Sequence, residues 1–64
     1  MYRLNEDWGQ FAPAYRAALE RLGATPDEIE RLLDGAWNAV EYCDDVEELA
    51  RAELRLLREG AWGK

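Results

Sequence analysis

Residues 25–43, TPDEIERLLDGAWNAVEYC, decide the fold of this chain. Thr25 is a good helix N-cap, Pro26 suits the first helical position, and Glu28 stands where it can close a capping box with Thr25. Apolar residues then recur at helical spacing on one face: Ile29, Leu32, Leu33, Ala36, Trp37, Val40 and Cys43. The stretch predicts a central helix over residues 26–43. A break at Asp34 and Gly35 is the alternative, although the apolar phase continues through it.

A second helix is predicted before this stretch, over residues 7–22, by another apolar stripe: Trp8, Phe11, Ala12, Tyr15, Ala18, Leu19 and Leu22. Gly9 and Pro13 interrupt the segment. A bent helix and a short turn followed by a helix from Ala12 both fit it. Gly23 is placed to end the helix in a left-handed conformation.

A third helix is predicted over residues 45–59, with Asp44 or Asp45 as its N-cap and Gly60 at its end. Loops this short make consecutive helices antiparallel neighbours. We therefore predict a single all-α domain over residues 1–64. It is a compact three-helix bundle with a short N-terminal arm and a C-terminal tail.

Length and composition limit the class of protein. A chain of 64 residues makes one small domain, in which a single core only just offsets the entropy of ordering the chain. Its apolar runs fall short of the roughly 18 residues that a membrane span needs, and the N-terminus does not resemble a signal peptide. With one cysteine, no internal disulfide can form. These features predict a cytoplasmic protein that does not associate with membranes.

Negative charge is concentrated in the middle of the chain. The net charge is −6, and residues 23–48 contain nine acidic residues against Arg31 alone. Such a density argues against direct binding to nucleic acid or to anionic lipid, because phosphate contacts require Lys and Arg. It favours a basic protein surface as the partner.

The residue inventory argues against catalysis and against a bound metal or cofactor. The chain has no His and no Ser, which excludes Ser–His triads and His-containing metal motifs. Cys43 is the remaining nucleophile, and it falls on the apolar face beside Asp44, where the thiolate is disfavoured. The cluster at 44–48 lacks the spacing of an EF-hand. We therefore predict no catalytic residues, no metal site and no cofactor.

The acidic edge of the central helix is the best candidate for a binding site. Asp27, Glu30, Asp34 and Glu41 share one flank, and the acidic turn at 44–48 lies beyond it. Trp37 and Tyr42 lie off or at the margin of the apolar stripe, and both residue types are favoured at interfaces. The predicted partner-binding residues are Asp27, Glu30, Asp34, Trp37, Glu41, Tyr42, Asp44 and Asp45. The plain alternative is the solvated face of a helix.

Glu53 breaks the pattern of the third helix, because it lies inside the apolar arc. A buried carboxylate is costly unless it is paired. Either Glu53 faces an arginine of another helix, such as Arg16, Arg21 or Arg31, or that sector is open and forms an interface.

These observations lead to a ranked functional hypothesis. The first candidate is a non-enzymatic acidic module that occupies or blocks a basic surface of a partner, which could be a nucleic-acid-handling protein. Phage-encoded inhibitors and antitoxins offer an analogy of size and charge only. The second candidate is a self-associating structural or adaptor bundle. The oligomeric state expected is a monomer or a weak homodimer.

Overall fold

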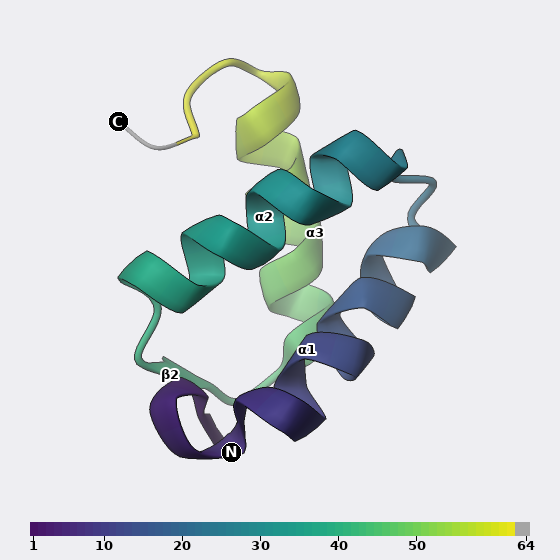
Figure 1. The fold of residues 1–64 in the computed structure, drawn as a ribbon. Helices are drawn as coiled ribbons and strands as arrows, with labels where there is room; N and C mark the ends of the chain where they lie inside the picture. Colours follow the sequence, from purple (N-terminus) through teal and green to yellow (C-terminus); the bar gives the residue numbers. More distant parts are fainter. Residues whose placement is uncertain (63–64) are drawn as a thin grey trace.

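The computed structural model describes residues 1–62 and confirms the predicted all-α three-helix bundle (Figure 1). Within those residues the elements, in chain order, are β1 (Tyr2–Arg3), α1 (Leu4–Arg21), α2 (Pro26–Ala39), β2 (Tyr42–Cys43) and α3 (Val46–Arg58). The last two residues of the predicted C-terminal tail lie outside the described part.

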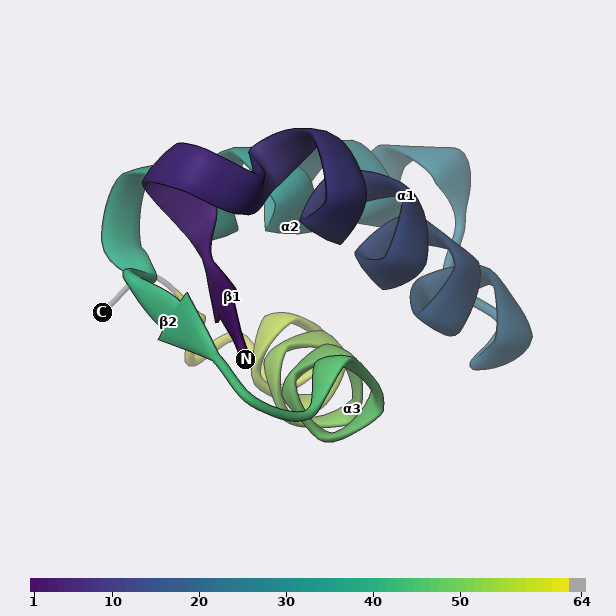
Figure 2. The ribbon, with the colours of Figure 1, turned by 90° about the horizontal axis from the view of Figure 1, so that it is seen from below.

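The axes of the three helices are not all aligned. α1 and α2 lie side by side and run in opposite directions (Figure 1). α3 crosses this pair steeply, so that in Figure 2 it is seen nearly along its axis while α1 and α2 lie across the view. α1 packs extensively on both other helices, whereas the contact between α2 and α3 is smaller. α1 is therefore the hub of the bundle.

Local sequence signals define the connection between α1 and α2 as predicted. The Thr25 hydroxyl accepts a hydrogen bond from the Glu28 amide at 3.2 Å, and the Glu28 carboxylate accepts one from the Thr25 amide at 2.9 Å. Gly23 has a φ of +83°, and the Ala24 amide donates to the Leu19 carbonyl at 3.0 Å. This is the Schellman arrangement, which satisfies the last carbonyls of α1.

α2 ends at Ala39 and not at Cys43, so the predicted C-terminal boundary is wrong by one turn. Val40 adopts an extended conformation, and the chain then forms β2, which pairs antiparallel with β1 in the register Tyr2↔Cys43. The Leu4 amide donates to the Glu41 carbonyl at 3.1 Å. Extended pairing with the N-terminal arm replaces the last helical turn. The β-branched and aromatic residues Val40 and Tyr42 suit it.

α1 begins at Leu4, three residues before the predicted start, and it bends at Asp7 and not at the proline. Asp7 has non-helical angles, φ −107° and ψ 17°, and its carboxylate accepts a hydrogen bond from the Arg3 amide at 3.1 Å. Pro13 lies exposed inside the continuous helix. A bend is therefore present, but it lies at Asp7 and not at Gly9 or Pro13, so neither alternative is correct as stated.

The core is centred on α1. Phe11, Tyr15 and Leu19 are fully buried, and the Phe11 and Tyr15 rings stack with centroids 5.1 Å apart. The other buried apolar residues come from α1 itself and from α2, β2 and α3: Leu4, Ala18, Ile29, Leu32, Ala36, Cys43, Ala50 and Leu54. Of the stripe predicted for α2, Leu33 and Val40 are only half-buried and Trp37 is exposed.

The described part of the C-terminal tail folds back onto the middle of α2. Asp45 caps α3 and Gly60, with a φ of +76°, turns the chain after it. Trp62 is then half-buried and packs against the core. A Cβ atom at Gly35 would lie 2.9 Å from Cη2 of the Trp62 ring, so an alanine there would force the ring to shift.

Candidate protein-binding site

Three of the predicted acidic residues form an exposed row on α2. Asp27, Glu30 and Asp34 follow one another at helical spacing, and all three are exposed. We call them the acidic stripe. Asp27 faces Arg31 at 3.9 Å, but these side chains are 81% and 65% exposed, so the pair is worth little. The stripe therefore presents its negative charge to solvent.

Trp37 continues the same row toward the end of α2. It is 53% exposed, contrary to its assignment to the helix stripe that forms the core. Its ring packs edge-to-face against the Trp8 ring, with centroids 4.9 Å apart. The Trp8 ring in turn packs against the Phe11 ring, with centroids 5.6 Å apart. Trp37 is thus an ordered aromatic side chain that still offers half of its surface, which is the property of an interface anchor.

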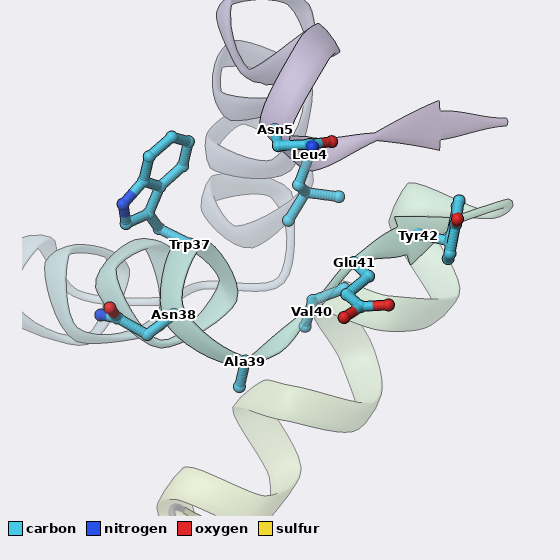
Figure 3. Close-up of a pocket in the computed structure, with 8 residues that line it drawn as sticks. All are labelled: Leu4, Asn5, Trp37, Asn38, Ala39, Val40, Glu41 and Tyr42. Atoms are coloured by element: carbon cyan, nitrogen blue, oxygen red, sulfur yellow. The ribbon is translucent and has the colours of Figure 1, made fainter.

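A groove of about 440 Å³ opens beside Trp37, where α2 gives way to β2 (Figure 3). We call it the junction groove. Trp37 and Tyr42 lie on opposite sides of it in Figure 3, with Leu4, Val40 and Glu41 between them. The complete lining is Leu4, Asn5, Trp37, Asn38, Ala39, Val40, Glu41 and Tyr42. Three predicted binding residues, Trp37, Glu41 and Tyr42, therefore meet at one place.

The early end of α2 changes the position of Glu41. The sequence placed Glu41 on the flank of the acidic stripe, but it lies beyond the helix, in the extended segment. Its carbonyl accepts the hydrogen bond from Leu4, and its exposed side chain lines the groove. Tyr42, in β2, is 56% exposed, and the Arg3 guanidinium carbon lies 6.0 Å from its ring centroid. This ring already receives a cation.

Asp44 and Asp45 lie in the turn after β2 and are exposed. The Asp45 carboxylate accepts a hydrogen bond from the Glu48 amide at 3.2 Å, so it serves as the N-cap of α3. Both residues line a second depression of about 310 Å³, which Tyr42 also lines. Of the two, Asp45 has a structural role, and Asp44 extends the acidic surface past Tyr42.

Cys43 is buried, as predicted, although it lies in a strand and not on a helix. Burial raises the pKa of its thiol, and the carboxylates of Asp44 and Asp45 raise it further. A thiol in this setting is a poor nucleophile at neutral pH.

Glu53 does not form the ion pair that the sequence suggested. Among the salt bridges of residues 1–62, none joins Glu53 to Arg16, Arg21 or Arg31. Glu53 is half-buried near the Tyr15 hydroxyl. That hydroxyl is buried and has no hydrogen-bond partner among residues 1–62. Burial raises the pKa of Tyr15, and the charge of Glu53 adds to that effect. The pairing hypothesis is wrong.

One important polar contact was missed from the sequence. The Arg58 guanidinium, on α3, donates to both Glu28 carboxylate oxygens at 3.0 and 3.1 Å and to the Gly23 carbonyl at 3.2 Å. The hydrogen bonds from Arg58, and after them the one from the Thr25 amide, lower the pKa of Glu28 to about 2. The two residues are 30 positions apart, so no local pattern could indicate the pair.

Three further findings bear on function. In residues 1–62, no three His, Cys, Asp or Glu side chains gather closely enough to hold a metal ion. No helix of the described part is both long and apolar enough to cross a membrane. Comparisons with protein-family models, with curated proteins and with solved structures return no match to this chain.

Proposed function

We propose that this protein is a non-enzymatic acidic module of the cytoplasm that binds a basic surface of a protein partner. The observation that carries the proposal is the acidic stripe, which is exposed and leads directly to the exposed Trp37. Charge of one sign steers a partner and an aromatic anchor holds it. The chain itself adds to this argument, because residues 32–50 contain six acidic residues and no basic one.

The absence of catalysis in this proposal follows from the residue types. The chain has no His or Ser, and its one thiol is buried with a raised pKa. A module that acts by occupying a surface needs neither a nucleophile nor a general base. A partner that handles nucleic acid fits, since its basic surface would accept an acidic competitor.

Calorimetric titration with poly-L-arginine tests the proposal. We expect binding that weakens about tenfold or more between low and moderate salt, because exposed charges are screened. Replacing Glu30 and Asp34 by Lys should abolish most of this binding while far-UV circular dichroism stays helical. The matched control reverses Glu48 and Glu59, which changes the net charge equally. Equal losses in both variants would mean that only total charge matters and would reject the stripe.

Self-association is the second candidate, and exposed leucines favour it. Leu22 and Leu56 are 37% and 41% exposed, and Leu22 lines a depression of about 360 Å³ together with Leu54. Single exposed leucines are common on monomers, so this candidate ranks lower. A dimer formed in this way should persist at high salt in sedimentation experiments.

A further inference from the structure

We propose that the junction groove binds an arginine-bearing segment of the basic partner, with Trp37 and Tyr42 as aromatic walls and Glu41 as counter-ion. This inference rests on the proposed function and names the site and the chemistry of its ligand. A volume of about 440 Å³ lies in the range of roughly 300–1,000 Å³ typical of ligand pockets. It is ample for a long side chain and the backbone next to it.

Charge complementarity identifies the occupant as cationic. The groove is lined by one carboxylate, that of Glu41, and by no Lys or Arg. Asp34 stands one turn before the groove residue Asn38, whose side-chain amide donates to the Asp34 carbonyl at 2.8 Å. Asp44 follows shortly after Tyr42 on the other side. The carboxylates of Glu41, Asp34 and Asp44 would repel an acidic peptide or a phosphate.

The helix dipole of α2 adds to the same preference. The C-terminal end of a helix carries a partial negative charge. Among the three helices of residues 1–62, α1 and α3 have arginines in their last turns, whereas α2 has no basic residue there. The groove opens at this end of α2, so a cation of the partner that enters it would offset the partial negative charge of the helix end.

The surroundings of Arg3 indicate that the partner's cation is an arginine and not a lysine. Its guanidinium lies 6.0 Å from the Tyr42 ring centroid and 3.9 Å from the Glu6 carboxylate, on the side of β1. One guanidinium of the protein itself therefore lies near both this ring and a carboxylate. Trp37 and Glu41 offer the same two kinds of group inside the groove. A guanidinium can stack on an aromatic face while it donates to a carboxylate, which an ammonium does less well.

The test uses the full 64-residue chain and a short capped peptide with two arginines around a leucine. A second peptide replaces both arginines by citrulline, which keeps the shape and removes the charge. We expect the amide resonances of residues 37–42 to shift with the arginine peptide, and the citrulline peptide to bind at least about tenfold more weakly.

Variants locate the binding. Trp37→Ala should weaken it about 30-fold or more, as expected of an anchor residue. Glu41→Lys should weaken it as strongly, and it keeps the backbone hydrogen bond to Leu4, so it remains informative if Trp37→Ala disturbs the fold. Leu56→Ala, at an exposed apolar residue outside the groove, is the control and should have no effect.

The outcomes separate this inference from the proposed function. If reversal of Glu30 and Asp34 weakens peptide binding while Trp37→Ala and Glu41→Lys do not, the groove is rejected and the acidic stripe stands. If no variant changes the affinity, both proposals fail. A dimer that disappears both with Trp37→Ala and with Arg51→Glu, at an exposed arginine of α3, would make a second copy of this chain the occupant and overturn the assignment to a partner.

Discussion

The two ends of α2 use acidic residues in opposite ways. At the N-terminal end, Glu28 accepts hydrogen bonds from Thr25 and from Arg58, so its charge is neutralised within the fold. At the C-terminal end, Asp34 and Glu41 are exposed beside a groove walled by Trp37. Glu28 is closed off by its own contacts, although Asp27 beside it stays exposed, and the C-terminal end is open. An acidic residue becomes available for binding only where the fold brings no cation to it.

The largest expected effect lies between the two ends, at the buried Leu32. Replacing Leu32 by Ala should lower the free energy of unfolding by about 2–5 kcal/mol, because the side chain is 1% exposed and leaves a cavity. Leu33→Ala should cost clearly less, since Leu33 is half-buried. Urea denaturation of the two variants checks the ranking. Equal losses would mean that Leu33 is packed as tightly as Leu32.

The middle of α2 provides the next effect, at Gly35. Alanine is the better helix former by about 1 kcal/mol, but its Cβ would meet the Trp62 ring. Gly35→Ala should therefore fail to stabilise the natural chain and should stabilise a Trp62→Ala variant by about 1 kcal/mol. Thermal melts of the four members of this cycle measure the coupling. If Gly35→Ala raised the melting temperature in both backgrounds, the contact between Trp62 and Gly35 would be contradicted.

The open end should contribute less to stability than to binding. Trp37→Ala removes the ring pair with Trp8, a contact worth about 1 kcal/mol. We expect the free energy of unfolding to fall by about 1–2 kcal/mol, from the ring pair and the buried part of the side chain, while affinity for the arginine peptide falls steeply. A loss comparable to that of Leu32→Ala would place Trp37 in the core and remove it from the binding site.

The closed end should show the smallest effect, and one that depends on pH. The folded-state pKa of Glu28 is lowered from its ordinary value near 4.5 to about 2. A lowered pKa stabilises the fold above about pH 4.5, and the contribution disappears as the pH falls toward 2. Glu28→Gln should therefore be less stable than the natural chain at pH 7.

The stability difference between the two proteins should then shrink between pH 5 and pH 2, since both share every other carboxylate. Gln can still accept the hydrogen bond from the Thr25 amide, so the comparison isolates the ion pair with Arg58. Thermal melts at several pH values measure it. A constant difference across this range would contradict the lowered pKa.

Much of the fold was predictable because its signals are local. Thr25, Pro26 and Glu28 begin α2 through groups three residues apart, and Gly23 and Gly60 end the neighbouring helices because they can adopt positive φ. The helical stripe of α1 likewise identified the fully buried Phe11, Tyr15 and Leu19. Such interactions join residues within one or two helical turns, so the local sequence is enough to predict them.

The candidate site was predictable in its residue types but not in its shape. Trp37, Glu41 and Tyr42 were identified from charge and from their margin position. A helix running to Cys43 would have kept Glu41 on the acidic flank. Only the pairing of β2 with the N-terminal arm ends α2 at Ala39 and opens the groove there.

The sequence by itself determined the three helices, the caps at Gly23, Thr25, Asp45 and Gly60, and the excess of negative charge, because the caps and stripes depend on residues a few positions apart. Tertiary structure decided which charges stay free. Glu28 is paired because Arg58, 30 residues later, reaches it, and Glu53 is not paired because no arginine of the described residues does. Trp37 is exposed because α1 supports only one side of it, through Trp8. Contacts between distant residues depend on how the helices cross, and local periodicity carries no information about that angle.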